Sequence, residues 1–214
     1  MTRSQTFWAG IFGVVLFVVT CALGGWHIEG YRHVAQYISE TYAAGTPHGR
    51  WLCFLGFIPA GLLLTAFAWQ ARRLVPATLP ASAGFIALGL FYGLGTVVCS
   101  LFPCDPGCGR LSSDNASASQ LIHNLAGLLT YLTVPATLIT LGVTARKWPG
   151  GKTVARAGLI CGVVAAIGAV LFLGNPQSPV AGLVQRITEA AILTWIVICA
   201  FYLRRAEHSA ANTP

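Results

Sequence analysis

The sequence predicts an all-α integral membrane protein, a bundle of about six transmembrane helices. Hydrophobic residues make up 55% of its 214 residues and charged residues only 9%, which leaves too little polar surface to solvate a globule of this size. The mean hydropathy of +0.69 agrees with that class. The apolar residues also fall into runs of roughly twenty, the length that a helix needs to cross the hydrocarbon core.

The predicted helices lie near residues 6–26, 51–70, 81–102, 119–145, 153–174 and 187–203, in one domain over residues 1–214. We expect helices rather than strands because an open sheet edge is unstable in lipid, and the chain lacks the alternating pattern of a barrel strand. The first run is long for the core of a signal peptide and has no small-x-small cleavage site. We therefore expect it to stay in the protein as a helix.

The basic residues orient the predicted bundle. The formal net charge is +7, but these residues stand in short clusters beside apolar runs, where they set topology and meet anionic head groups. We therefore exclude nucleic acid as a partner. Nine of the thirteen lie on the side of the two termini: Arg3, Arg72, Arg73, Arg146, Lys147, Lys152, Arg156, Arg204 and Arg205. The positive-inside rule then predicts that both termini are cytoplasmic.

The first outer loop, residues 27–50, contains a predicted short helix. His33, Gln36, Tyr37 and Glu40 are spaced at i, i+3, i+4 and i+7, which is one stripe of a helix. The AAGTP sequence that follows is typical of a helix end. Two interpretations remain open. The helix lies on the head groups with a solvated polar face, or its polar stripe faces inward across the mouth of the bundle.

Inside the predicted helices the sequence indicates close packing. Glycines four residues apart occur in two of them: Gly89 with Gly93, and Gly158 with Gly162. Such pairs let neighbouring helices approach closely. Pro59 and Pro135 are predicted to kink their helices, with the freed carbonyls satisfied by neighbours.

The polar hairpin at residues 101–123 holds two cysteines around an aspartate and a Pro-Gly turn. The turn brings the Cα atoms of Cys104 and Cys108 within bridging range, so we expect a disulfide in an oxidising exterior. A loop this small adds little entropic stability, and its expected use is to hold Asp105 in a fixed orientation. A Cys/His metal site is the competing interpretation, although C-x3-C without a second pair is weak evidence for it.

His123 lies about one turn inside the fourth predicted helix, with Ser119 four residues earlier on the same face. An ionisable residue at this depth is costly if it faces lipid, so we expect it to point into the bundle. Asp105 and Glu40 are its predicted partners. A structural histidine that is simply hydrogen-bonded within the bundle is the alternative.

Arg186 and Glu189 stand at the predicted start of the sixth helix, after a loop with two prolines. They are three residues apart and able to pair, which would make them a structural clamp at the membrane surface. If Arg186 turns inward instead, it becomes the anion-holding group of the site.

Several of these stretches together resemble a known family. They are HVAQYISETYAAGTP in the first outer loop, LFPCDPGCG after the third helix, the histidine of the fourth helix, and GLVQRITE at the start of the sixth. Over nearly the whole chain they resemble the bacterial membrane family catalogued as domain of unknown function 998 (DUF998). The resemblance implies a six-helix bundle, places the protein in the bacterial inner membrane, and draws attention to His33, Glu40, Asp105 and His123.

Two functions remain open. In the preferred one, an outward-facing polar pocket holds a lipid head group, a small solute or a partner membrane protein. Its predicted binding residues are His33, Tyr37, Glu40, Asp105, His123, Arg186 and Glu189. In the alternative, the protein is an intramembrane hydrolase in which metal-bound water, on a metal such as zinc, cleaves a lipid amide or ester at the outer leaflet. Its predicted metal ligands are His33, Asp105 and His123, with Ser119 or Glu40 assisting.

Overall fold

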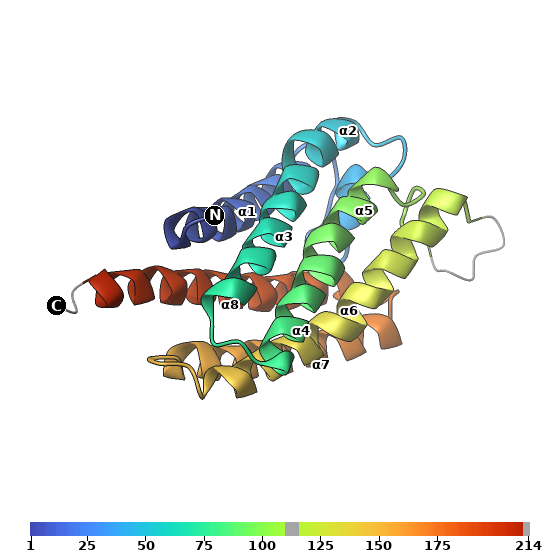
Figure 1. Ribbon diagram of the computed structural model, residues 1–214. Coiled ribbons are helices and arrows are strands. Elements are labelled where there is room, and N and C mark those ends of the chain that lie inside the picture. The colour runs from blue at the N-terminus through green and yellow to red at the C-terminus, as the bar shows by residue number, and fades with distance from the viewer. Residues whose placement is uncertain (110–115, 212–214) are drawn as a thin grey trace.

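The computed structural model describes residues 1–109 and 116–211, and side chains as far as Arg205. Within these ranges every regular element is a helix, and six spans are long and apolar enough to cross a membrane (Figure 1). The single-helix spans are α1 (Arg3–Trp26), α6 (Ala118–Ala145), α7 (Lys152–Gly174) and α8 (Ala181–Ala211). The predicted fold class is therefore confirmed.

The second and third spans each contain a stretch of π-helix. The second consists of α2 (Gly49–Trp51), the π-helix η2 (Leu52–Phe57) and α3 (Ile58–Leu74). The third consists of α4 (Leu79–Ala87), the π-helix η3 (Leu88–Leu94) and α5 (Gly95–Leu101). Short π-helical stretches are rare and often occur at functional sites. Pro59, where a kink is predicted, lies just after η2, at the start of α3.

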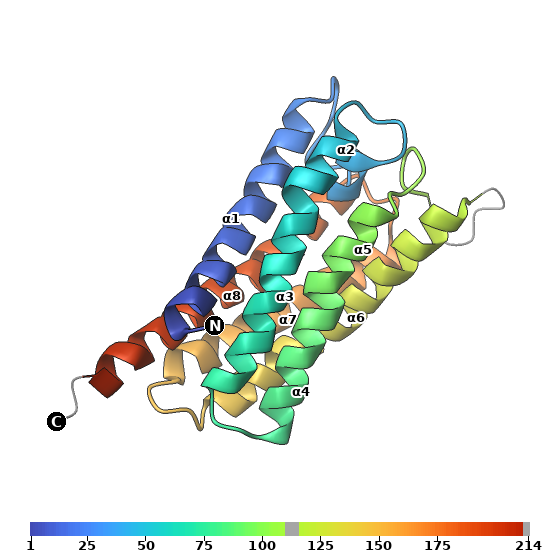
Figure 2. The ribbon, with the colours of Figure 1, turned by 45° about the horizontal axis from the view of Figure 1, so that its top comes forward.

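Both termini lie at the same end of the bundle (Figure 2). We call this the terminal end, and the opposite end, where the 3₁₀ helix η1 (Ile38–Tyr42) lies, the η1 end. The nine clustered basic residues lie in the chain segments at the terminal end. Of the other four, Arg32, Arg50 and Arg186 belong to segments at the η1 end, and Arg110 lies outside the described residues. The cytoplasmic location of the terminal end remains a prediction.

The first outer loop differs from its prediction. It contains a short helix, as expected, but only the five residues of η1 are helical. The backbone of Tyr37 is extended, with φ −67° and ψ 153°, and separates His33 and Gln36 from Glu40. The predicted single stripe is therefore wrong. The physical reason is that the Arg186 guanidinium donates to the carbonyl oxygens of His33 at 2.7 Å and Gln36 at 2.8 Å, so these carbonyls are satisfied without a helix.

The last helix begins at Ala181, earlier than the predicted residue 187. Residue 187 marked the start of the apolar run, but the polar residues before it find partners inside the protein and belong to the helix. Glu189 therefore lies about 12 Å along the helix from Ala181, more than two turns from its start. It is a residue of the bundle interior, with 8% of its surface exposed, and not a residue of the membrane surface.

At the terminal end, α6 and α7 pack closely through glycine. A Cβ atom on Gly158 would lie 2.7 Å from the Cα atom of Gly142, and one on Gly162 would lie 2.6 Å from the Ile139 side chain. The predicted close approach at this pair is confirmed. The contact continues as far as Pro135, whose carbonyl oxygen would be 3.1 Å from a Cβ atom on Gly162.

The two glycines of the other predicted pair, Gly89 and Gly93, differ in how closely the neighbouring helix approaches them. A Cβ atom on Gly93 would lie 2.7 Å from the backbone nitrogen of Thr65, so this glycine is needed for the approach of η3 to α3. At Gly89 the nearest atom would be the Ala68 Cβ at 3.5 Å, an ordinary contact. The Thr65 hydroxyl donates to the Gly61 carbonyl at 2.8 Å and lies 3.3 Å from that of Gly89, which links the two spans.

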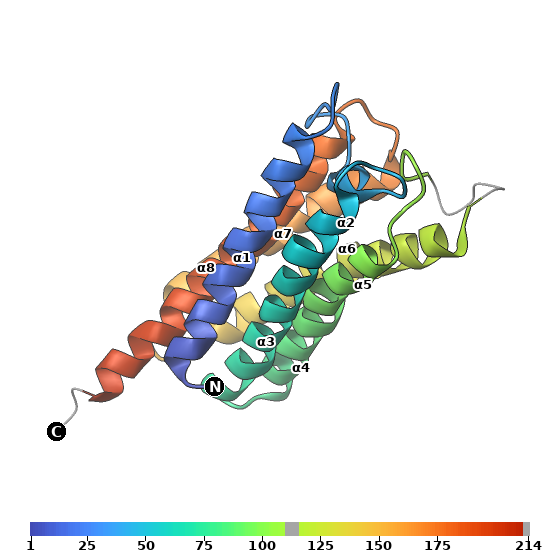
Figure 3. The ribbon, with the colours of Figure 1, turned by 90° about the horizontal axis from the view of Figure 1, so that it is seen from above.

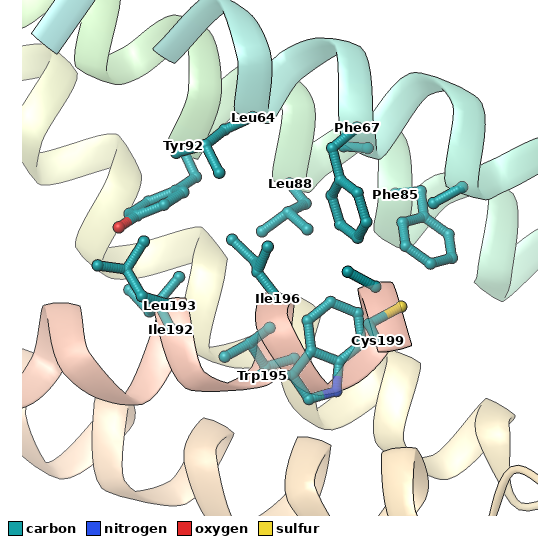
Figure 4. Packing of buried hydrophobic residues seen from close by; sticks show 14 of the residues in the cluster. Leu64, Phe67, Phe85, Leu88, Tyr92, Ile192, Leu193, Trp195, Ile196 and Cys199 are labelled. Atoms are coloured by element: carbon teal, nitrogen blue, oxygen red, sulfur yellow. The ribbon is translucent and has the colours of Figure 1, made fainter. Parts of the chain in front are cut away.

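Large apolar side chains fill the space between the helices toward the terminal end (Figure 4). Phe67, Phe85 and Trp195 have no exposed surface. Tyr92 lies at one edge of this cluster, and its hydroxyl points away from Phe85 and Trp195 (Figure 4). Toward the η1 end the packing changes, because the first half of α6 diverges from α7 and α8 (Figure 3).

Candidate functional site

A cavity of about 610 Å³ lies at the η1 end, where α6 diverges from α7 and α8. Its volume is within the range of roughly 300–1,000 Å³ that is usual for small-molecule sites. Each of the six spans contributes to its lining, through Phe17, Phe57, Tyr92, Tyr131, Phe172 and Glu189. Gly107, Cys108 and Gly109 of the polar hairpin also line it. We call it the Glu189 cavity.

The carboxyl group of Glu189 is held by two tyrosines from other spans. The Tyr92 hydroxyl donates to Oε2 at 2.7 Å, and the Tyr131 hydroxyl donates to Oε1 at 2.7 Å. Within the described residues, no Lys, Arg or His side chain forms an ion pair with Glu189. The bundle thus contains a carboxyl group that is hydrogen-bonded at both oxygens but has no cationic partner.

Gln185 fixes the direction of these hydrogen bonds. The backbone N–H of Ile38 donates to Gln185 Oε1 at 2.8 Å, which leaves the Nε2 amide hydrogens pointing the other way. Nε2 donates to the Tyr131 hydroxyl at 3.1 Å, so that hydroxyl accepts from Gln185 and gives its own proton to Glu189. The chain of bonds joins η1, α8 and α6 at the carboxyl group.

Two rows of aromatic rings extend from the tyrosines that hold Glu189; we call them the aromatic walls. The first wall runs from Tyr92 to Phe17, Phe57, Tyr42 and His123, with successive ring centroids 6.3, 5.4, 4.8 and 6.1 Å apart. The second runs from Tyr131 to Phe172 and Tyr37, with centroids 5.0 and 5.2 Å apart. All seven of these phenylalanines and tyrosines line the Glu189 cavity.

His123 points into the bundle, as its predicted burial requires, and is 7% exposed. Its Nδ1 atom lies 3.0 Å from the carbonyl oxygens of both Cys99 and Phe102. Carbonyl oxygens only accept, so Nδ1 carries the proton and Nε2 is left as an acceptor. His123 therefore ties α6 to the end of α5 while lining the cavity, and its partners are backbone carbonyls rather than Asp105 or Glu40.

Glu40 and Tyr37 organise the first outer loop. The Glu40 carboxylate accepts from the Tyr37 backbone N–H at 2.8 Å and from Gln36 Nε2 at 3.1 Å, which closes the start of η1. The Tyr37 hydroxyl donates to the carbonyl of Pro176, and its ring lines the Glu189 cavity. Tyr37 is thus a lining residue, whereas Glu40 acts on the loop backbone.

Cys104 and Cys108 form the predicted disulfide, with Cα atoms 5.0 Å apart. The Asp105 carboxylate between them accepts from the backbone N–H of Ser117 at 2.9 Å. This hydrogen bond holds the pKa of Asp105 below its usual range. The hydroxyl of Ser119 donates to a backbone carbonyl, that of Pro103, at 2.7 Å. Asp105 and Ser119, both predicted site residues, therefore attach the hairpin to the start of α6.

Arg186 and His33 do not line the Glu189 cavity. They line a second cavity of about 310 Å³ between α1 and α8, which Glu189 also lines. The Arg186 guanidinium donates to the Tyr31 hydroxyl at 2.6 Å as well as to the backbone of the first outer loop. The predicted pair with Glu189 is not formed, because the Arg186 guanidinium donates to the loop instead. The anion-holding role of Arg186 stays a prediction. Burial raises the pKa of Tyr31, and the hydrogen bond from Arg186 opposes that rise.

The predicted metal ligands are not brought together. His33 lines the smaller cavity, Asp105 bonds to the start of α6, and His123 lines the Glu189 cavity. Across residues 1–109 and 116–211, no group of three or more His, Cys, Asp or Glu side chains is placed to hold a metal ion. The proposed convergence of His33, Glu40, Asp105 and His123 is likewise absent, since only His123 lines the Glu189 cavity.

Sequence reasoning missed Tyr92, Tyr131 and Gln185. A signal for Gln185 was present, because it stands four residues before Glu189 and so shares its helix face. The tyrosines carried a weaker signal, a hydroxyl within an apolar span that needs a partner in lipid. Which partner each one finds depends on how the helices pack.

The comparisons with known proteins give one match. The family model described as "Protein of unknown function (DUF998)" matches residues 11–202. Neither a curated protein nor a solved structure matches the chain.

Proposed function

We propose that this chain, which belongs to the DUF998 family, binds a lipid head group or small solute in the Glu189 cavity. The observation that carries the proposal is the cavity itself, about 610 Å³ in volume, in which a carboxyl group is held by two tyrosine hydroxyls. Buried polar groups in a span are costly and are usually functional when they face a cavity. Here four buried polar side chains from η3, α6 and α8 are joined by hydrogen bonds: Tyr92, Tyr131, Gln185 and Glu189.

The size of the cavity favours a small ligand over a partner helix. A helix with its side chains is about 10–12 Å across, too wide to enter a cavity of this volume. Of the predicted ligands, a head group or solute fits, and a partner membrane protein would have to use another surface.

The hydrolase alternative receives less support from the arrangement of the side chains. Its predicted metal ligands lie in three different places. The Ser119 hydroxyl donates to the Pro103 carbonyl, and the Glu40 carboxylate accepts from the loop. Catalytic groups need to be within hydrogen-bond reach of one another, and these residues are not arranged in that way.

The clustered basic residues support a cytoplasmic terminal end, with the Glu189 cavity on the opposite side of the bacterial inner membrane. Reporter fusions test this sidedness. Fusions at the two termini and after Arg73 are expected to read cytoplasmic, and a fusion after Gly45 is expected to read external. An external C-terminus would contradict the proposed orientation.

Native mass spectrometry tests the proposed binding, with a variant that fills the cavity. A Cβ atom on Gly127, which lines the cavity, would meet no atom within 4 Å, so Gly127→Leu places a side chain in the empty space. Leu132→Phe is the matched control, because Leu132 is on the same helix, is 58% exposed and does not line the cavity. The probes are phosphatidylethanolamine, phosphatidylcholine and phosphatidylglycerol, each added to delipidated protein, together with free ethanolamine and choline.

The expected result is one molecule retained per wild-type or Leu132→Phe chain and loss of that molecule in Gly127→Leu. Equal retention by Gly127→Leu, or no retained probe or co-purifying molecule in the wild type, would overturn the proposal.

A further inference from the structure

We infer that the ligand of the Glu189 cavity carries a cationic amine, either a primary ammonium or a quaternary ammonium group, that contacts the Glu189 carboxylate between the two aromatic walls. This inference rests on the proposed function and names the chemical class of its ligand. Three features of the described residues support it: charge, unused hydrogen-bonding capacity and the aromatic lining.

No lysine or arginine among the described residues lines the cavity beside Glu189. Among the described lining residues, Glu189 is the one Asp, Glu, Lys or Arg side chain. Its two hydrogen bonds come from neutral phenols, and no cationic side chain pairs with it. A buried carboxylate is stable when it is both hydrogen-bonded and paired with a cation. The protein supplies the hydrogen bonds to Glu189, and a cationic ligand would supply the opposite charge.

The unused hydrogen-bonding capacity near Glu189 is for accepting. The hydroxyl protons of Tyr92 and Tyr131 and an amide proton of Gln185 are already donated within the network. Each carboxylate oxygen has two lone-pair sites and receives one hydrogen bond from the described residues, so each has one site left. Nε2 of His123 adds a further acceptor to the lining. A group that donates, such as an ammonium, satisfies these atoms, whereas the oxygens of a phosphate or carboxylate cannot.

The aromatic walls suit the same group. The face of a phenylalanine or tyrosine ring attracts an organic cation. Proteins commonly recognise ammonium groups by surrounding them with several such rings. Phe17, Phe57 and Phe172 present apolar ring surface to the cavity next to the tyrosines. Ser39 and Tyr42 add hydroxyls that both donate and accept, so they do not favour one ligand class over another.

Two sources of ligand share this chemistry, the head group of an ethanolamine or choline lipid and a free amine. The wild-type protein distinguishes them without any substitution. Retention of phosphatidylethanolamine or phosphatidylcholine at least tenfold above phosphatidylglycerol identifies a lipid head group. Calorimetric binding of free ethanolamine or choline to delipidated protein, with no lipid preference, identifies a free amine. Choline is compared with its neutral isostere 3,3-dimethylbutan-1-ol, which is expected to bind at least tenfold more weakly.

Glu189→Gln is the direct variant test, with Glu29→Gln as its matched control. Both remove one carboxylate, but Glu29 is exposed and does not line the cavity. We expect the preference for the amine over its neutral counterpart to fall roughly tenfold or more in Glu189→Gln, because removing one partner of a buried charge contact has an effect of this order. Glu29→Gln is expected to keep the preference.

The outcomes separate this inference from the proposed function on which it rests. Equal retention of phosphatidylglycerol and the amine lipids, with loss of both in Gly127→Leu, would overturn the amine inference and leave binding in the cavity intact. The same holds if choline and its neutral isostere bind equally. If wild-type protein retains neither a probe nor a co-purifying molecule, both proposals fail.

Discussion

The two ends of this bundle differ in how closely their helices pack. Toward the terminal end, α6 and α7 approach until Gly158 and Gly142 are in backbone contact, and large apolar side chains fill the remaining space. Toward the η1 end, α6 leaves α7 and α8, and the space between them is a cavity lined by aromatic rings and by Glu189. The same helices therefore close at one end and open at the other.

This difference in packing predicts which property a substitution at each end will affect. In lipid, helices associate mainly through close packing, so the glycine contacts at the terminal end hold the bundle together. The polar groups at the η1 end add little packing and are costly to bury, which supports the binding proposed above. Substitutions at the terminal end should therefore affect stability, and those around the cavity should affect ligand binding.

The largest expected effect is at the glycine contact. Gly158→Leu is expected to destabilise the protein by about 3 kcal/mol or more, because the new side chain would meet the backbone of Gly142 and the structure must shift to admit it. Gly127→Ala at the open end is the comparison. It meets no atom within 4 Å and replaces a helical glycine, so it is expected to be neutral or slightly stabilising. Thermal unfolding in detergent measures both. Equal destabilisation would show that the two ends do not differ in packing.

A smaller effect is expected from removing one tyrosine hydroxyl at each end. Tyr131→Phe leaves Glu189 Oε1 and Gln185 Nε2 without their partner, and should destabilise the protein by about 1–3 kcal/mol. Tyr202→Phe removes a hydroxyl whose 3.1 Å bond to the Pro149 carbonyl is exposed, so its effect should be within about 0.5 kcal/mol. A more destabilising Tyr202→Phe would contradict the expectation that losing the buried partners of Tyr131 is the more costly change.

The smallest effect concerns the hairpin at the rim of the cavity. The hydrogen bond from Ser117 lowers the pKa of Asp105 in the folded protein, so the unfolded chain binds a proton more readily. This contribution to stability is fully present above the ordinary aspartate pKa of about 3.9 and is lost as the pH falls through the lowered value. The unfolding temperature of the wild type should therefore approach that of Asp105→Asn below about pH 4. A difference between the two proteins that stays constant down to pH 2 would contradict this linkage.

The sequence by itself determined the bundle. Hydrophobic length sets the number of spans, and a Pro-Gly turn between Cys104 and Cys108 sets a local disulfide, because both properties depend on residues close together in the chain. The close contact at Gly158 also followed from a local pattern. The predicted start of the sixth helix was wrong because it depends on contacts that are not local. Gln185 and Arg186 are polar residues whose partners are far away in the sequence.

Only the tertiary structure decided the site. Glu189 meets Tyr92 across 97 residues of chain and Tyr131 across 58. These meetings depend on the rotation of each helix about its axis and on its distance from its neighbours. Both are fixed by packing between spans, which no local pattern records. The sequence located the polar residues, and the packing of α6 against α7 at one end, with its divergence at the other, decided which of them share a cavity.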